Sequence, residues 1–184
     1  DVNTTYVTKE ILKKISQTNT PPKVMAVVKK RKESNRLGEK ILILDNIQDP
    51  GNLGTIIRSA NAFNMDTIVL SDNTVDLYNP KVIRATQGML FHINIIRRNP
   101  VNFINYLKDS GYKIIGTKVT NGHDVRDAKI YSHFALIIGN EGRGISNEVD
   151  KLCDEYLYIR MNESCESLNA SVAASILMYE INNK

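Results

Sequence analysis

The sequence contains no tryptophan and only two cysteines, Cys153 and Cys165. Two free thiols in a reducing compartment account for that number, so no disulfide framework is expected. The three histidines, His92, His123 and His133, do not have the spacing of metal ligands. We therefore expect no metal site.

Long hydrophobic runs are also missing. No apolar run approaches the roughly 20 residues that a membrane-spanning helix requires, and residues 1–20 lack the apolar segment of a signal peptide. These absences predict a cytoplasmic protein without a membrane partner. The chain begins with Asp1 rather than Met, and we expect something upstream of it to be missing.

The chain has 184 residues, of which 42% are hydrophobic, enough for one full domain with a core and a short attached piece. Lys and Arg total 24 against 20 Asp and Glu, which gives a formal charge of +4. This charge suits an anionic partner, but many proteins with no nucleic-acid role are as basic. Charge alone does not identify the partner.

The order of predicted elements indicates an α/β fold. A helix is expected at 8–17, then a breaker run, an apolar stretch at 24–28, and a charged linker or solvated loop at 29–40. Beyond it, short apolar runs alternate with helical stretches, as in a parallel sheet with helices on both faces. The expected strands are 41–44, 67–70, 93–96, 113–116, 135–138 and 156–159, and the expected helices are 54–63, 80–87, 101–109, 146–151 and 168–181.

The first unusual loop follows the strand at 41–44 and reads DNIQDPGN, with Arg58 expected in the second turn of the next helix. Ligands of open parallel sheets bind outside the carboxyl ends of the strands. Asn, Gly and a helix N-terminus can meet an anionic ligand there. Six residues separate Asn52 from Arg58, so both can face one cleft. For a single turn of this kind, however, we favour an Asx cap and a surface arginine.

The second unusual loop surrounds Glu141 with Gly139, Gly142 and Gly144 after the strand at 135–138. Glycine lets a backbone approach a flat ligand such as a nucleoside. The pattern is neither GxGxxG nor a phosphate-binding P-loop. A glycine-rich turn before the helix at 146–151 explains it equally well.

The third unusual loop follows the strand at 156–159 and leads into a helix rich in Ala and Ser. Ser167 is predicted as the N-cap of this helix, with Asn169 close by. An apolar stripe along the helix predicts a core or a dimer contact rather than a cofactor site. The stripe consists of Leu168, Val172, Ile176 and Tyr179.

In their order and spacing, the three loops together resemble the three signature motifs of the SpoU (TrmH-like) family of RNA 2′-O-ribose methyltransferases, in the SPOUT superfamily. The resemblance spans residues 41–181. Residues 14–28 resemble the end of a ribosomal-protein-like RNA-binding domain, most of which would be absent. The implied organisation is an N-terminal domain remnant at 1–28, a linker at 29–40 and a catalytic domain at 41–184. The motif residues are Asn46, Asp49, Pro50, Asn52, Gly54, Arg58, Ala60, Gly139, Glu141, Gly142, Gly144, Ile159, Met161, Ser167, Leu168, Asn169, Ser171, Val172 and Ala173.

The resemblance implies a parallel sheet whose C-terminal segment forms a deep trefoil knot, and an active site completed across a homodimer. It also implies S-adenosylmethionine as the cofactor. The residues that it implies for cofactor binding are Thr117, Gly139, Asn140, Glu141, Gly142, Ile159, Met161, Leu168 and Asn169.

The implied reaction transfers a methyl group to a ribose 2′-hydroxyl of structured RNA, most simply 23S ribosomal RNA. Arg58 is the implied group for proton removal or hydroxyl orientation. Because a guanidinium stays protonated, a bound phosphate beside Arg58, or Glu141 acting through water, is a better proton acceptor. Asn52, Ser167 and Asn169 complete the implied catalytic set.

Two departures from the third motif bear on this function. Arg160 stands where the family usually has Pro, and Glu163 stands where it usually has Gly. These changes alter the rigidity and charge of a loop that holds the cofactor in the family. Two alternatives therefore remain: a transfer-RNA ribose methyltransferase, and a non-catalytic RNA-binding protein on a methyltransferase scaffold. A nucleotide-binding Rossmann enzyme is a more distant third.

Overall fold

The computed structural model describes residues 3–16, 18, 20–129 and 131–183, and it divides into two compact units, residues 1–32 and 33–184. The first unit contains one helix, α1 (Lys9–Ile15), inside the helix predicted at 8–17. Thr8 caps α1 by accepting a hydrogen bond from the backbone N–H of Ile11. None of the α1 residues is buried, and the apolar stretch at 24–28 is exposed.

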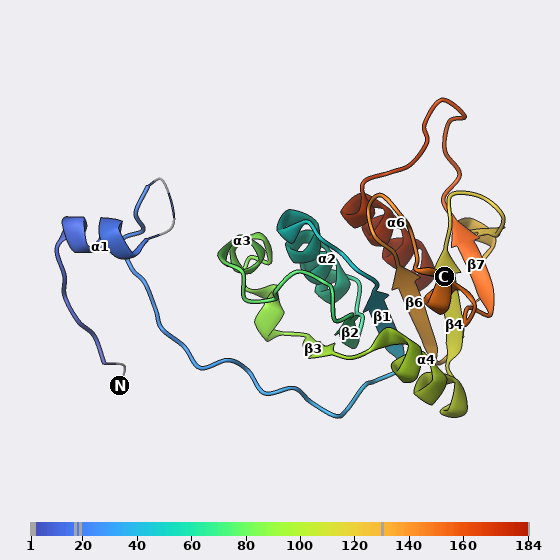
Figure 1. The fold of residues 1–184 in the computed structure, drawn as a ribbon, viewed down its shortest axis with the longest axis horizontal. Helices are drawn as coiled ribbons and strands as arrows, with labels where there is room; N and C mark the ends of the chain where they lie inside the picture. Colours follow the sequence, from blue (N-terminus) through green and yellow to red (C-terminus); the bar gives the residue numbers. More distant parts are fainter. Residues whose placement is uncertain (1–2, 17, 19, 130, 184) are drawn as a thin grey trace. The chain divides into compact units, whose positions relative to one another are not determined.

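The second unit is an α/β domain in which strands and helices alternate (Figure 1). Each strand and each longer helix predicted beyond residue 40 is confirmed, with ends that shift by a few residues. The elements are β1 (Lys40–Leu44), α2 (Pro50–Ala62), β2 (Thr67–Leu70), α3 (Pro80–Ala85), η1 (Met89–Phe91), β3 (Asn94–Arg97), α4 (Pro100–Asp109), β4 (Lys113–Thr117), β5 (His123–Asp124), η2 (Val125–Asp127), β6 (Phe134–Ile138), α5 (Asn147–Asp150), β7 (Glu155–Tyr158) and α6 (Ala170–Asn182).

The strands form one sheet in the order β3-β2-β1-β6-β4-β7-β5, and each neighbouring pair is parallel. Their carboxyl ends therefore meet along one edge of the sheet. The loops after β1, β6 and β7 open at this edge, as the sequence predicts for the three unusual loops. β5 was not predicted, because two residues are too few to show a pattern.

Alternate residues of the central strands point into two separate cores. Leu42 and Leu136 belong to the core beneath α2 and α6. Ile43 and Ile137 belong to the core beneath α4 and α5. Because neighbouring residues of a strand face opposite sides, this division places apolar layers on both faces of the sheet. The prediction of helices on both faces is confirmed.

Three helices begin with the same pair of residue types. An Asp or Asn provides the cap, and a proline occupies the first helical position in α2, α3 and α4. The cap side chain accepts a backbone N–H, and proline at this position has no N–H to leave unpaired. The caps are Asp49, Asn79 and Asn99.

Residues 33–39 run along the edge of the sheet. The carboxylate of Glu33 accepts hydrogen bonds from the backbone N–H of Arg97 and the guanidinium of Arg98. Asn94 exchanges hydrogen bonds with the backbone of Ser34. The boundary between the two units thus falls within residues 29–40, and the later part of that segment is held by β3.

No helix among the described residues is long and apolar enough to cross a membrane. The same residues contain no group of three or more His, Cys, Asp and Glu side chains arranged to hold a metal ion.

Candidate functional site

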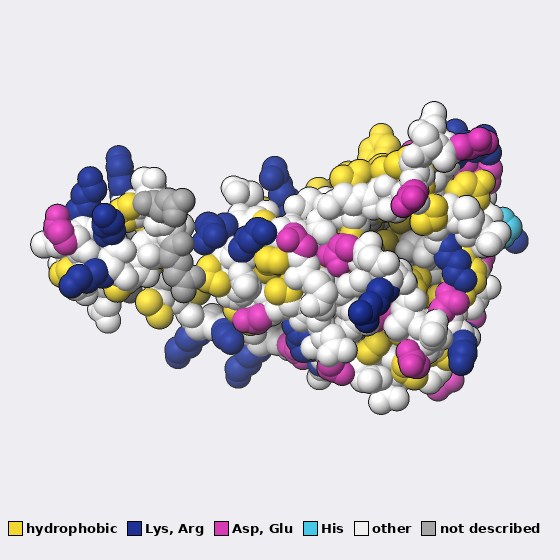
Figure 2. Space-filling model, turned by 45° about the horizontal axis from the view of Figure 1, so that its top comes forward, with side chains coloured by type: hydrophobic (Ala, Val, Ile, Leu, Met, Phe, Trp, Pro, Cys, Tyr) yellow, Lys and Arg dark blue, Asp and Glu magenta, His cyan; other side chains and the backbone are white. Residues whose placement is uncertain are grey.

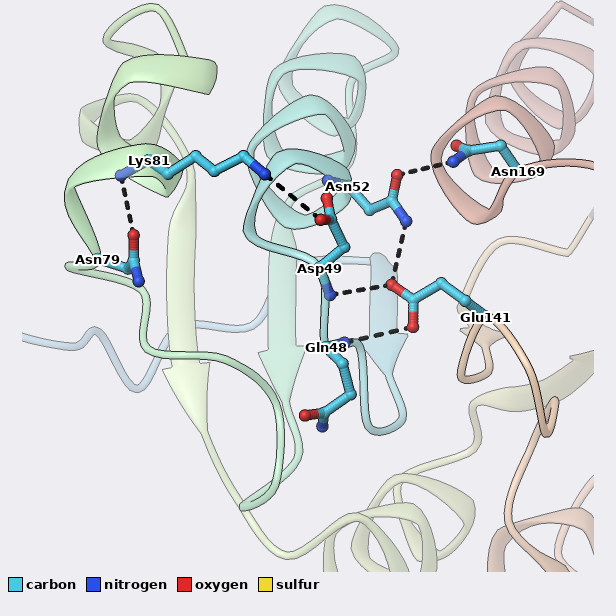
Figure 3. A network of polar contacts seen from close by, with 7 residues as sticks. All are labelled: Gln48, Asp49, Asn52, Asn79, Lys81, Glu141 and Asn169. Atoms are coloured by element: carbon cyan, nitrogen blue, oxygen red, sulfur yellow. Dashed lines mark hydrogen bonds and ion pairs between the residues drawn. The ribbon is translucent and has the colours of Figure 1, made fainter. Parts of the chain in front are cut away.

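The three unusual loops meet in one hydrogen-bonded network centred on Asn52 (Figure 3). The Asn52 side-chain amide donates to Oε1 of Glu141 at 3.1 Å. Its oxygen accepts from Nδ2 of Asn169 at 2.9 Å. One residue from each loop therefore contributes to a single chain of contacts, although 117 positions separate Asn52 from Asn169 in the sequence.

Glu141 joins the first and second loops. Its carboxylate accepts from the backbone N–H groups of Gln48 at 3.3 Å and Asp49 at 3.2 Å, besides the Asn52 amide. Partial burial raises the pKa of Glu141, but the hydrogen bonds from Asn52 and from backbone N–H groups outweigh it and hold this pKa below its usual value. Both oxygens are occupied, so Glu141 is a poor proton acceptor in this arrangement.

Asn169 is the N-cap of α6, and this corrects the prediction that Ser167 is the cap. Oδ1 of Asn169 accepts from the backbone N–H of Ser171 at 2.9 Å and of Val172 at 3.4 Å. The helix begins at Ala170, two positions later than predicted, so the Ser167 side chain lies too early in the chain to cap it. Asn169 thus uses its oxygen for the helix and its amide for Asn52.

The helix after the first loop begins earlier than predicted. Asp49 caps α2, and residues Pro50 to Asn52 already form its first turn. Arg58 consequently lies in the third turn rather than the second. Its side chain is exposed, and no hydrogen bond or ion pair to it is found among the described residues. Asn52 is buried in the network, and the described part of the chain shows no hydrogen bond between Asn52 and Arg58.

A pocket of about 560 Å³ lies beside this network, next to the carboxyl ends of β4, β6 and β7. Each predicted cofactor-binding residue except Asn169 lines it, as does Ser167, whereas Asn52 and Arg58 do not. A volume of this size suits a drug-sized molecule. The predicted residues in its wall are Thr117, Gly139, Asn140, Glu141, Gly142, Ile159, Met161 and Leu168.

Of the two explanations for the glycines of the second loop, the structure supports the glycine-rich turn at two positions. A Cβ on Gly139 would stand 2.2 Å from the backbone of Gly144 and of Ile145. Gly144 has φ +71°, where other residues are strained. A Cβ on Gly142 would meet only the Asn140 side chain, at 3.8 Å. Gly139 and Gly144 are therefore required by the turn of the loop itself.

Two contributions to the site are missed by the sequence analysis. Asp45 is buried at 1% exposure, and its carboxylate accepts from the backbone N–H of Ser146 at 2.7 Å, which ties the first loop to the second. The loop after β4 supplies further pocket wall at Lys118, Val119 and Asn121. Its place after a parallel strand was the available signal, but its composition is ordinary.

Comparison with known proteins agrees with this geometry. Residues 39–179 match the SpoU rRNA Methylase family. The chain is 41% identical over 167 residues to the 23S rRNA (guanosine(2553)-2′-O)-methyltransferase RlmP of Bacillus subtilis, covering 91% of this chain and 67% of that protein. It covers 64% and 63% of two staphylococcal relatives, so it spans about two thirds of the length of these curated relatives.

Two solved structures are similar in fold. The SpoU methyltransferase AviRb from Streptomyces viridochromogenes, in complex with the cofactor AdoMet, has a TM-score of 0.85 at 31% identity, covering 95% of this chain and 71% of that one. The TrmH/SpoU tRNA modifying enzyme of A. aeolicus has a TM-score of 0.71 at 26% identity, covering 80% and 75%. The match to the family covers most of the chain and includes all three loops. The chain therefore belongs to the SpoU rRNA methylase family.

Proposed function

We propose that this chain carries the catalytic domain of an S-adenosylmethionine-dependent RNA 2′-O-ribose methyltransferase, and that its substrate is 23S ribosomal RNA. The observation that carries the proposal is the Asn52–Glu141–Asn169 network, which joins the three motif loops beside the pocket. The 41% identical relative is named as an enzyme of this kind and favours ribosomal over transfer RNA.

The pocket fits the proposed cofactor. Its wall combines apolar residues with polar residues of the loops, and this mixture suits a molecule that has a flat base and polar ends. When bound, S-adenosylmethionine supplies a methyl group that is already activated by its sulfonium. The chain's own task is to hold the two reactants in line and to manage the hydroxyl proton. The apolar residues of the wall are Val119, Ile138, Ile145, Leu157, Ile159, Met161, Leu168, Ala170, Ala173 and Leu177.

Arg58 is the proposed group for orienting the ribose hydroxyl. Its guanidinium is exposed and remains protonated, so it donates hydrogen bonds but does not accept the proton. The occupied carboxylate of Glu141 disfavours the route through a water on that residue. A phosphate of the bound RNA beside Arg58 is therefore the proposed acceptor. Asn52 and Asn169 hold the motif loops in place around the reacting groups. Ser167, which lines the pocket, contacts the cofactor.

An RNA partner is supported by the distribution of charge. Eight of the 24 Lys and Arg residues, but only two of the 20 Asp and Glu residues, lie in residues 1–32. This segment thus carries +6, and the remaining residues carry −2. Dark blue side chains accordingly crowd the first unit in Figure 2. Clustered cations release counterions from a phosphate backbone and supply affinity that does not depend on sequence.

The remaining features are proposed by analogy with the family. Residues 1–28 are the end of an N-terminal RNA-binding domain, and residues 41–184 are the catalytic domain. Support for a homodimer comes from α6, where Val172 is 46% and Tyr179 51% exposed although both belong to its apolar stripe. The trefoil knot is proposed from the family alone; α6, which follows β7, packs on α2, where the Ser175 hydroxyl donates to Ser59 at 2.7 Å.

The test is methyl transfer from radiolabelled S-adenosylmethionine to protein-free 23S ribosomal RNA and, in parallel, to bulk transfer RNA. Ribose methylation is recognised by dinucleotides that resist alkaline hydrolysis. Label in ribosomal RNA supports the proposal, and label in transfer RNA alone reassigns the substrate. Cofactor and RNA binding without transfer would favour the non-catalytic scaffold.

A further inference from the structure

A buried carboxylate lies beside the loop that leads from β7 to α6. The side chain of Asp124 is 3% exposed and contacts two guanidinium groups. Arg126 binds it through two nitrogens, Nε at 3.0 Å from Oδ1 and Nη2 at 2.7 Å from Oδ2. Arg160 also contacts this carboxylate, with Nε 3.3 Å from Oδ2. These contacts, led by those of Arg126, lower the pKa of Asp124 to about 2, so the carboxylate stays charged at neutral pH.

Asp124 is held rigidly by its surroundings. In the pairing of β5 with β7, Asp124 stands opposite Tyr158, two residues before Arg160. It also caps η2 by accepting the backbone N–H of Arg126 at 3.0 Å, and the next residue, Val125, is part of the core. The carboxylate therefore offers a fixed point at the residue where β7 ends and the loop begins.

The loop itself has little other support. Residues 162–167 are exposed, and the segment between β7 and α6 projects from the body of the domain (Figure 1). The hydrogen bonds of Asn162, Ser164 and Cys165 remain within the loop. Arg160, in contrast, reaches out of the loop to Asp124. Its two sequence neighbours, Ile159 and Met161, both line the pocket.

We propose that Arg160 is a positioning residue for the cofactor: its ion pair with Asp124 fixes the start of this loop and so sets the pocket wall formed by Ile159 and Met161. The ion pair takes over the restraint that proline provides at this position in the family. Arg160 is thereby a substitute for proline and not a sign of lost binding. This inference rests on the proposed function, because it assumes that the pocket takes S-adenosylmethionine.

The test is calorimetric titration of S-adenosylmethionine, and of S-adenosylhomocysteine, into the full chain and its variants. Arg160→Gln removes the ion pair and is expected to raise Kd by about two- to fivefold, the size of effect that an exposed ion pair can exert. Asp124→Asn is expected to raise Kd similarly, with no further increase in the double variant. Arg160→Pro, unlike Arg160→Gln, is expected to bind with the wild-type Kd, because the proline ring fixes the backbone without a charge.

Ionic strength separates an ion pair from a general structural effect. Added NaCl is expected to raise Kd more steeply for the wild type than for Arg160→Pro, because salt screens exposed pairs. Arg126→Gln is the matched control: it removes the other guanidinium from the same carboxylate but leaves the loop tied, so Kd is expected to stay near the wild-type value. Thermal unfolding of every variant checks that it remains folded.

Two results would overturn the inference alone. The first is a wild-type chain that binds the cofactor with a Kd that Arg160→Gln leaves unchanged. The second is an equal loss in Arg126→Gln and Arg160→Gln, which would assign the effect to net charge and not to the loop. A folded wild-type chain that binds neither compound would instead overturn the proposed function, and this inference with it.

Discussion

Asn52→Asp is the most informative change in the network, because it replaces a donor by a charge while keeping the shape of the side chain. In the wild type, Nδ2 of Asn52 lies 3.1 Å from Oε1 of Glu141. An aspartate presents an oxygen at that place, whichever way it turns, so the hydrogen bond becomes a contact between two carboxylates. The hydrogen bond from Asn169 to the other oxygen is retained.

The size of the effect follows from the distance and the surroundings. Two unit charges about 3 Å apart repel by about 1.4 kcal/mol in water and by about 5 kcal/mol at the effective dielectric of a protein surface. Asn52 is 9% exposed and Glu141 is exposed, so a value near the lower end, about 2 kcal/mol, applies. The lost hydrogen bond adds about 1 kcal/mol. We expect the free energy of unfolding to fall by about 3 kcal/mol at neutral pH.

The dependence on pH gives this prediction its test. Repulsion raises the pKa of one carboxyl in the folded variant, so the folded state holds more protons than the unfolded state above pH 4 or so. The destabilisation is then largest at neutral pH and is relieved as the pH falls through the raised value. In the wild type the lowered pKa of Glu141 gives the opposite trend, with its contribution lost in acid.

Urea unfolding at mildly acidic and at neutral pH measures both trends. Asn52→Ala is the control, since it removes the hydrogen bonds to Glu141 and from Asn169 without adding a charge. Its deficit relative to the wild type is expected to grow less between acid and neutral pH than that of Asn52→Asp, because it loses one of the hydrogen bonds that lower the pKa of Glu141 but adds no repulsion. If Asn52→Asp and Asn52→Ala lose the same free energy at both pH values, Glu141 does not face Asn52 in the folded protein.

Three further changes test the rest of the site. Arg58→Ala is expected to abolish methyl transfer to RNA while calorimetry still detects S-adenosylmethionine binding; retained turnover would remove Arg58 from the mechanism. Gly139→Ala is expected to weaken cofactor binding at least about tenfold (~1.4 kcal/mol), because its Cβ would stand 2.2 Å from the Gly144 and Ile145 backbone, whereas Gly142→Ala, where the nearest protein contact is 3.8 Å, should leave the loop undistorted and weaken binding less. Asn169→Ala is expected to cost about 1 kcal/mol in urea unfolding as a lost N-cap, and Ser167→Ala close to nothing; equal losses would contradict the observed cap.

The fold could be predicted largely because its strands are buried on both faces. Runs such as ILIL at 41–44 and ALII at 135–138 have no polar alternation, and this pattern identifies central strands of a parallel sheet. The order of strands could not be predicted, since it depends on which crossover connections pack best. The short strand at 123–124 left no signal, although it places Asp124 beside the loop after β7.

Helix starts were predicted less well, for an identifiable reason. Pro50 and Gly51 were assigned to a turn because both residue types are common in turns. Proline is equally suited to the first position of a helix when a capping residue precedes it, and Asp49 is such a cap. The start of α6 was uncertain for a similar reason, because the side chain of either Ser167 or Asn169 can cap a helix. Only Asn169 also has an amide that reaches Asn52.

The site residues fall into two groups that the sequence did not distinguish. The Asn52 side chain uses its amide for Glu141 and its oxygen for Asn169, and the side chains of Glu141 and Asn169 each also accept a backbone N–H. Such groups hold loops in place but have little capacity left for a reaction. Arg58 is exposed, with no hydrogen bond or ion pair found in the described part of the chain, so its donors remain available to RNA. Because a guanidinium cannot take up a proton, the proposed mechanism assigns Arg58 to orienting the hydroxyl and takes its proton acceptor from the substrate.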